Sequence, residues 1–286
     1  MPNESKRENA INAVTSGVII APLKGWTQLG LRDVWEYRDL IWSFTARNFR
    51  IRYRQMALGP LWSILSPLID MVIFSTIFGG LAKLPSDGVP YSIFAYTALI
   101  PWGYFSGVTN GAAGSLVSEM DVISKIYFPR LVIPFSNVLS LLFDTVISLL
   151  ILLGMAFYYH FPFTWRLLLM PFYLALAALA GLGIGLWLAT LAVRYRDVRN
   201  LAGYGLQIMK FATPVVYSAS LIPEKWQALY RLNPMYWVVE GFRWIFLGTG
   251  QAPSLMIGIS GILAVLIFVT GMYVFQRTER TIVDWL

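Results

Sequence analysis

The sequence predicts an all-α integral membrane protein with six transmembrane helices, and three observations lead to this fold class. Hydrophobic residues make up 57% of the 286 residues and charged residues only 13%, whereas a soluble domain carries about 25% charged residues. Long apolar segments cover most of the chain, and a helix needs roughly 20 such residues to cross a bilayer. The Lys and Arg residues gather between alternate apolar segments, as in multi-pass membrane proteins.

Six apolar segments are the expected spans, and each is 22 to 29 residues long. They cover residues 61–82, 91–117, 131–159, 167–193, 200–222 and 254–275. Three of them hold one ionisable residue each, namely Asp70, Asp144 and Lys210. Because a charge that faces lipid is costly, these side chains should point into the protein. Asp144 and Lys210 have opposite signs, so they can form an ion pair, or they can contact a substrate.

The basic residues predict the orientation in the membrane. Nine Lys and Arg precede the first span, and seven more follow in the even-numbered links and the tail, against five in the opposite links. Loops with more Lys and Arg stay on the cytoplasmic side, so both termini should be cytoplasmic. We expect a multi-pass protein of a bacterial cytoplasmic (inner) membrane, in contact with lipids. The net charge of +7 then reflects topology and does not indicate a nucleic-acid partner.

Residues 31–58 precede the first span and have an amphipathic helical pattern. One face carries Trp42, Ala46, Phe49 and Tyr53, at the spacing of successive helical turns. This pattern predicts a helix that lies in the cytoplasmic membrane interface. Its arginines Arg50, Arg52 and Arg54 are candidate contacts for the diphosphate of a lipid head group, because guanidinium groups fit phosphate geometry. The simpler interpretation is a membrane-surface anchor.

The link between the second and third spans resembles a capped helix start. Ser118 is a suitable N-cap, and Glu119 and Asp121 stand in the first turn. We expect a short helix over 119–129 that docks on a cytoplasmic partner, although an ordinary capped loop would also fit the residues.

Residues 223–253 are rich in aromatic side chains but too interrupted to span. The Asn233-Pro234 pair divides this segment into two amphipathic halves, because the residue before proline avoids the helical conformation. We expect a re-entrant helical hairpin on the extracytoplasmic side, which caps or gates a path. Glu240 and Arg243 are three residues apart and can pair on one helical face.

Four segments in order resemble the transmembrane subunit of ABC-2-type polysaccharide exporters, which move O-antigen, capsule or teichoic-acid-like polymers. These segments are residues 39–62, 123–130, 194–200 and 214–243. The similarity covers about residues 30–280 and makes residues 59–286 the six-helix transmembrane domain. Residues 1–30 lie outside it and are expected to be a cytoplasmic segment.

The resemblance implies a homodimer of this subunit with two cytoplasmic ATP-binding-cassette subunits, and a polyprenyl-diphosphate-linked glycan as substrate. It also implies that the helix over 119–129 transmits the motion of the ATPase. The candidate coupling residues are Glu119, Asp121, Ile123, Lys125 and Tyr127.

The residues themselves indicate that the motor is a separate polypeptide. The chain contains no GxxxxGK[ST] phosphate-binding loop, so ATP and Mg²⁺ should bind to a partner subunit. With no cysteine and a single histidine, it offers no predicted metal site. We expect a transport subunit with no catalytic residue and no cofactor of its own.

Aromatic residues on the spans are candidates for lining a polymer channel at the dimer interface, since sugar rings pack their C–H faces on aromatic rings. The candidates are Trp62, Trp102, Tyr104, Phe105, Tyr204, Phe211 and Tyr217. Packing against lipid is the alternative for each of them.

Other functions fit the same composition. The nearest is an ABC-2 exporter of a drug or another lipid. A membrane enzyme acting on polyprenyl phosphate would need clustered cytoplasmic carboxylates for Mg²⁺, and outside the N-terminal region only Glu119 and Asp121 are close together on that side. A proton- or sodium-coupled flippase would need more intramembrane ionisable groups or an inverted repeat.

Overall fold

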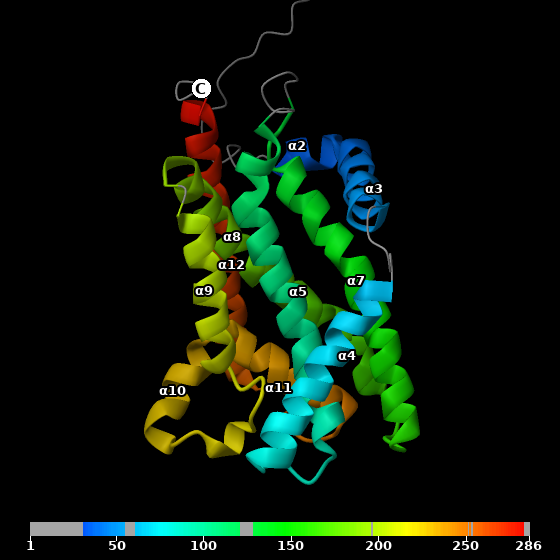
Figure 1. Cartoon of the computed structure of the whole chain (residues 1–286). Helices are drawn as coiled ribbons and strands as arrows, with labels where there is room; N and C mark the ends of the chain where they lie inside the picture. Colours follow the sequence, from blue (N-terminus) through cyan, green and yellow to red (C-terminus); the bar gives the residue numbers. More distant parts are fainter. Residues whose placement is uncertain are drawn as a thin grey trace, which may run out of the picture.

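The computed structural model describes residues 31–54, 61–120, 128–195, 197–250, 252 and 254–282. Within these ranges the chain is a bundle of helices without strands (Figure 1). The segment 1–30 lies outside the described residues, as do the predicted coupling residues Asp121, Ile123, Lys125 and Tyr127.

Among the described helices, four are long and apolar enough to cross a membrane. The first is α4 (Trp62–Phe74), continued by the π-helical turn η3 (Ser75–Leu81). The others are α7 (Val132–Tyr158), α8 (Met170–Arg194) with the preceding η4 (Trp165–Leu169), and α12 (Leu255–Ile282). They match the first, third, fourth and sixth predicted spans. In lipid, the backbone N–H and C=O groups of such an apolar run can form hydrogen bonds only within the helix itself.

The second predicted span is the central helix α5 (Tyr91–Ser118), which contacts α4, α7, α8, α9 and α11. It has 28 residues and is long enough to cross, but its Gly, Ser, Thr and Asn residues make it less apolar than the other four. Ser118 is the last residue of α5 and not the predicted N-cap of the next helix. The helix continues to that position because the apolar side chains before it pack in the core.

The fifth predicted span is shorter than expected. Helix α9 (Val198–Phe211) has 14 residues, whereas the sequence predicted a continuous segment over 200–222. The helix ends just before Thr213-Pro214, because a residue that precedes proline is pushed out of the helical conformation. Residues 212–218 form turns, followed by η5 (Ala219–Leu221).

Two helices form the predicted aromatic segment before the last span. They are α10 (Glu224–Leu232) and α11 (Pro234–Phe246), divided at Asn233 as expected. The Asn233 side chain accepts a hydrogen bond from the backbone N–H of Met235, a typical N-cap followed by proline. All residues of α11 except Trp244 are buried, and the helix packs on α5 and α8.

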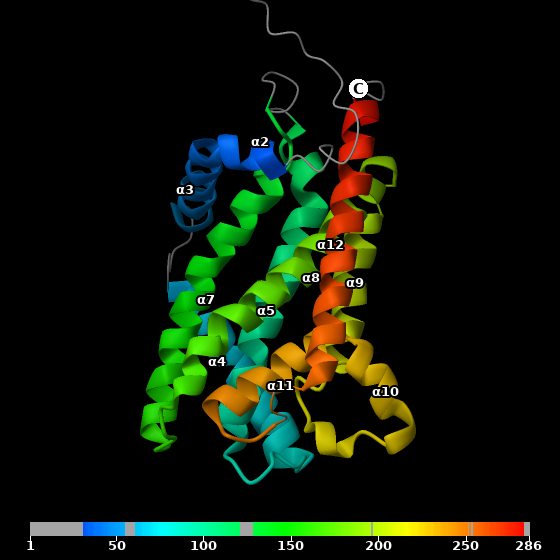
Figure 2. The ribbon, with the colours of Figure 1, turned by 180° about the vertical axis from the view of Figure 1, so that it is seen from behind.

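Helices α2 (Leu31–Glu36) and α3 (Arg38–Arg54) lie at the end of the bundle where α12 ends (Figures 1 and 2). Helices α10 and α11 lie at the opposite end. The aromatic side of α3 packs on α7, with Trp42 and Phe49 both against Phe143.

Small residues set the spacing in the centre of the bundle. A Cβ at Gly181 would lie 2.9 Å from the Phe105 carbonyl oxygen, and one at Gly185 would lie 2.5 Å from Ala112 Cβ. Any side chain at these positions would force α8 away from α5, so the close approach depends on glycine.

Candidate functional site

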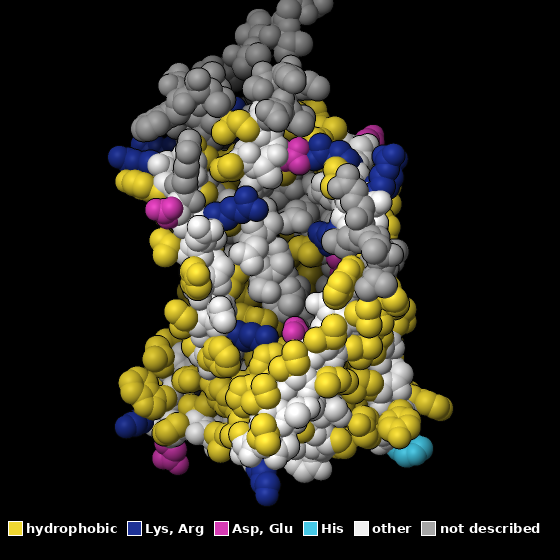
Figure 3. All heavy atoms as spheres, viewed as in Figure 1, with side chains coloured by type: hydrophobic (Ala, Val, Ile, Leu, Met, Phe, Trp, Pro, Cys, Tyr) yellow, Lys and Arg dark blue, Asp and Glu magenta, His cyan; other side chains and the backbone are white. Residues whose placement is uncertain are grey.

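One side of α5 is left uncovered by its neighbours. Gly103 and Asn110 are exposed, and Ser106, Gly107 and Gly111 are partly exposed. Their spacing of three and four residues places them on one face of the helix. Figure 3 shows this face of the molecule recessed between α9 on one side and α3 and α4 on the other. We call this surface the α5 groove.

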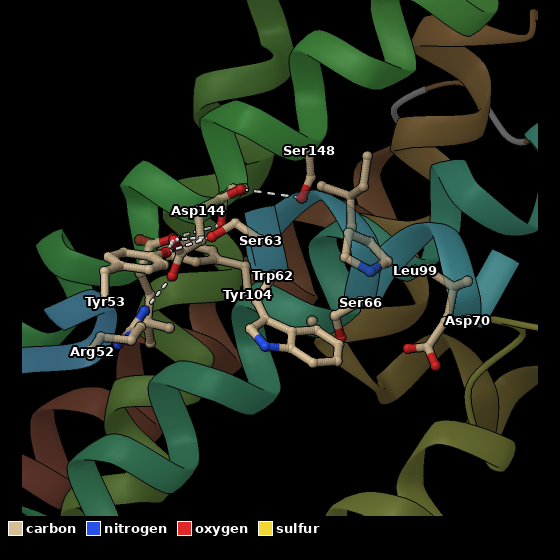
Figure 4. A pocket seen from close by; sticks show the side chains of 15 residues that line it. Arg52, Tyr53, Trp62, Ser63, Ser66, Asp70, Leu99, Tyr104, Asp144 and Ser148 are labelled. Atoms are coloured by element: carbon tan, nitrogen blue, oxygen red, sulfur yellow. Dashed lines mark hydrogen bonds and ion pairs between the residues drawn. The ribbon is translucent and has the colours of Figure 1, made fainter. Parts of the chain in front are cut away.

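One wall of the α5 groove contains a pocket of about 310 Å³ between the end of α3 and helices α4, α5 and α7 (Figure 4). We call it the α4 pocket. Gly103 and Tyr104 of α5 line it together with Trp62, Ser66 and Asp70 of α4. The lining mixes aromatic rings, hydroxyl groups and charges at the depth of a predicted membrane span.

A network of polar side chains ties α3 to α7 at one end of this pocket. Arg52 forms an ion pair with Asp144, and the Tyr53 hydroxyl donates a hydrogen bond to the same carboxylate. The Ser63 hydroxyl, on α4, donates a third hydrogen bond of 3.1 Å. Burial, and next the hydrogen bond to Asp144, raise the pKa of Tyr53 above its usual value.

The ion pair between Asp144 and Lys210 that the sequence allowed does not form. Asp144 instead pairs with Arg52 of α3. The sequence pattern did not predict which span α3 would contact. The Lys210 ammonium instead lies 4.4 Å from the centre of the Phe74 ring, a cation–π contact between α9 and α4.

The three candidate diphosphate contacts on α3 differ in their surroundings. Arg50 and Arg54 are exposed, whereas Arg52 is partly buried and bound to Asp144. Only the first two therefore present guanidinium groups at the surface of the described structure.

The other wall of the α5 groove is α9. A hollow of about 640 Å³ lies between α9 and α5, lined by Asn110, Arg199, Asn200, Gly203, Tyr204 and Gln207. Its lining has one cation and no acidic side chain among the described residues, unlike the α4 pocket.

The aromatic candidates separate into three groups. Trp62 and Tyr104 line the α4 pocket, and Tyr204 lines the hollow beside α9. Phe211, at the end of α9, is 49% exposed. The remaining three are Trp102 and Phe105, which are buried in the core, and Tyr217, whose hydroxyl donates to the Phe211 carbonyl.

The family model described as ABC-2 type transporter matches residues 39–247, most of the chain. The protein belongs to the ABC-2 transporter family. An O-antigen export system permease protein, RfbA of Myxococcus xanthus, is 31% identical over 76% of this chain and 83% of its own. A Klebsiella pneumoniae RfbA is 26% identical over 84% and 92% of the two chains. The polysialic acid transport protein KpsM of Escherichia coli is 24% identical over 68% and 76%.

In this ABC-2 permease, α3 is also tied to the start of the predicted coupling segment. Glu119, the first residue after α5, forms an ion pair with Arg47. The Arg47 guanidinium lies 4.5 Å from the Phe44 ring centre as well. Arg47 and Arg52 thus join one helix to two different parts of the bundle.

The predicted pair of Glu240 and Arg243 is present, with 3.0 Å between Arg243 Nη1 and Glu240 Oε1. Arg243 is fully buried, and it also donates to the carbonyl oxygens of Val215 and Tyr217. Its guanidinium lies 3.8 Å from the centre of the Phe94 ring. This arginine therefore holds the turn after α9 against α11 and α5.

Sequence reasoning missed several groove residues, including Ser66, Gly103, Asn110 and Gln207. The spacing of Trp62, Ser66 and Asp70 by four residues was a usable signal, since it places one aromatic, one hydroxyl and one carboxylate on a single helical face. No group of three or more metal-ligating side chains occurs within the described ranges.

Proposed function

We propose that this permease is the membrane-spanning subunit of an ATP-driven exporter that moves a lipid-diphosphate-linked polysaccharide across a bacterial cytoplasmic membrane. The similarity to permeases named for O-antigen export and polysialic acid transport, over most of their length, carries this proposal. In contrast, the similar region of YadH, an Escherichia coli inner membrane transport permease, covers only 37% of this chain.

The α5 groove has the surface chemistry that a polysaccharide requires. A path with only aliphatic walls would remove water from sugar hydroxyls without replacing their hydrogen bonds, at a cost of several kcal/mol for each group. Here the floor consists of Gly103, Ser106, Gly107 and Asn110, which leave room for a bulky chain. Trp62 and Tyr204 on the two walls offer faces on which sugar rings pack.

The groove is open along one side in a single subunit, and a second copy of the chain would close it. Helix α4 packs on α5 and α7 but has no fully buried residue, so its outer side is free to contact lipid or the partner subunit. In this proposal α5 is the second span, and α9 with residues 212–222 is the fifth. The hairpin of α10 and α11 re-enters from the outside. Both termini are cytoplasmic, as the excess of Lys and Arg on their side predicts.

Two cytoplasmic ATP-binding-cassette subunits would supply the energy, so that this chain is a transport subunit and not an enzyme. ATP and Mg²⁺ bind to those subunits, and the segment 119–129 contacts them. The ion pair between Glu119 and Arg47 supports this assignment, because it connects the start of that segment to α3. Nucleotide binding can shift the permease between conformations only if its energy differs between them.

The lipid diphosphate would dock on the cytoplasmic side of α3. Arg50 and Arg54, near the end of α3, are exposed cations. Arg52 becomes available only if its ion pair with Asp144 opens.

The decisive experiment is deletion of this gene, followed by complementation with variants and measurement of surface polysaccharide. We expect deletion to abolish the surface polymer while its lipid-linked precursor accumulates inside the cell. Trp62→Ala and Tyr204→Ala should reduce export at normal permease levels, and Phe157→Ala, an exposed position on α7 outside both groove walls, is the matched control. Normal surface polymer in the deletion strain, with loss of resistance to a drug instead, would favour the alternative exporter class.

A further inference from the structure

Three residues of α4 form a line along the α4 pocket. Trp62, Ser66 and Asp70 follow one another at intervals of four residues, so their side chains lie on one face of the helix. All three are exposed, and all three line the pocket (Figure 4). Four residues of helix rise by about 6 Å, which is comparable to the width of one sugar ring.

Ser66 and Asp70, the two polar residues of this line, do not hold α4 to its neighbouring helices. In the part of the chain that the structure describes, neither the Ser66 hydroxyl nor the Asp70 carboxylate has a hydrogen bond, and Asp70 has no ion pair. Asp144 in the same pocket is bound by three side chains. An aspartate at the middle of a lipid-facing helix costs about 2.5–3.5 kcal/mol or more, so an unsatisfied Asp70 indicates that the pocket holds a polar occupant.

The charges in the pocket argue against a phosphate as that occupant. Its lining contains one cation, Arg52, and two acids, Asp70 and Asp144. Arg52 is neutralised by Asp144, which leaves the charge of Asp70. Lys210 on α9 attracts Asp70 but lies beyond ion-pair distance. The net charge around the pocket is therefore zero or negative. A diphosphate requires an excess of positive charge.

We propose that the α4 pocket is a carbohydrate subsite, distinct from the place where the lipid diphosphate binds. A neutral sugar ring would pack its C–H face on the Trp62 indole. Its hydroxyls would donate hydrogen bonds to the Asp70 carboxylate and exchange hydrogen bonds with Ser66. The subsite rests on the proposed function, because it requires that a polysaccharide passes through the α5 groove.

Site-specific photocrosslinking in cells that export their own polysaccharide tests this subsite. The photoreactive residue p-benzoylphenylalanine replaces Ser66 or Asp70 in the full-length permease with its partner subunits. Ile69 and Ile73, exposed on α4 but outside the pocket lining, are the matched control positions. After illumination, the purified permease is examined by carbohydrate staining and mass spectrometry.

We expect carbohydrate adducts at positions 66 and 70, and lipid or no adducts at 69 and 73. Adducts at 66 and 70 that contain only acyl chains or a second permease subunit would overturn the subsite. Absence of carbohydrate adducts, or equal labelling at the control positions, would also overturn it.

Substitutions provide an independent measurement. Asp70→Leu should reduce the export rate by about tenfold or more, since it removes hydrogen bonds to a charged acceptor. Asp70→Asn retains an acceptor and should lose much less, and Trp62→Phe should export better than Trp62→Ala. Equal export by Asp70→Leu and the wild type would contradict the proposal.

These results separate the two proposals. If deletion of the gene leaves surface polysaccharide unchanged, the proposed function fails. If export depends on the permease but positions 66 and 70 label no carbohydrate, only the subsite fails.

Discussion

Helices α4 and α11 both carry ionisable residues, but only those of α11 are buried and paired within the chain. On α11, Glu240 and Arg243 are 3% and 0% exposed and pair with each other, and Arg243 also donates hydrogen bonds to two backbone carbonyl oxygens. On α4, none of the residues is buried, and Asp70 lines the α4 pocket with no hydrogen bond or ion pair to the described residues. The first arrangement is complete within the chain, whereas the second leaves hydrogen-bonding capacity for something else.

The contrast separates a structural charge from a functional one in a membrane protein. A buried ion pair contributes little net stability, but removal of one member is strongly destabilising because the other remains buried and charged. An unpaired charge in an open groove contributes little to the fold. Its loss should therefore affect transport and not folding, and stability measurements can distinguish the two cases.

The largest expected effect is at Arg243. Replacement by methionine leaves Glu240 without this partner and removes two donors to backbone carbonyls, so the free energy of unfolding should fall by about 3–5 kcal/mol. The melting temperature of the permease in lipid nanodiscs and its level in the membrane measure this loss. The double variant Glu240→Gln with Arg243→Met should recover part of the stability. If Arg243→Met alone were as stable as the wild type, the ion pair on α11 would not be structural, and the contrast with α4 would be wrong.

A smaller loss is expected at Gly241. A Cβ at this position would lie 2.0 Å from Tyr173 Cε1, so Gly241→Ala must displace that ring. Overpacking of this kind costs about 1–3 kcal/mol, and the same melting measurement detects it. Gly103→Ala is the matched control, because nothing lies within 4 Å of its added Cβ and alanine favours the helix. Equal melting temperatures for the two variants would show that α11 is less tightly packed than the structure indicates.

Asp144 is intermediate, since its network is partly exposed. Asp144→Asn removes the ion pair to Arg52, and we expect a loss of about 1–2 kcal/mol after allowance for solvent screening. Amide hydrogen exchange should rise in α3 more than in α8. The reversed pair, Arg52→Asp with Asp144→Arg, should restore part of the protection, and unchanged exchange in α3 would mean that the network does not hold this helix.

The smallest effect on stability is expected at Asp70. Because its carboxylate makes no hydrogen bond or ion pair in the described structure and Lys210 attracts it only from beyond ion-pair distance, Asp70→Asn should change the free energy of unfolding by less than about 0.5 kcal/mol. The melting temperature of the same nanodisc preparation measures it. A loss as large as that at Arg243 would show that Asp70 is a structural residue, and the comparison between α4 and α11 would no longer hold.

The apolar runs in the sequence predicted most of the helices, because in lipid the backbone must form its hydrogen bonds within each segment. The runs over 61–82, 131–159, 167–193 and 254–275 became four helices long enough to span. The sequence missed the early end of α9, where Thr213-Pro214 breaks an otherwise apolar run. Hydropathy alone does not register that break, although proline was a visible signal.

Side-chain partners were predicted only where they were close in sequence. The pair of Glu240 and Arg243 follows from a spacing of three residues on one helix. The pair of Arg52 and Asp144 spans 92 positions, and the sequence instead suggested Lys210 as the partner of Asp144. Likewise, the sequence pattern did not separate Trp102 and Phe105, which are buried in the core, from Gly103 and Asn110, which face the groove.

The sequence by itself determined that the chain is helical, that it belongs in a membrane, and which family its segments resemble. These properties depend on local composition and on the short range of helical hydrogen bonds. The tertiary structure alone decided which charges are satisfied and which face of α5 remains open. Those properties depend on the contacts between helices, which arise from side-chain shape over the whole bundle and leave no periodic signal in any single segment.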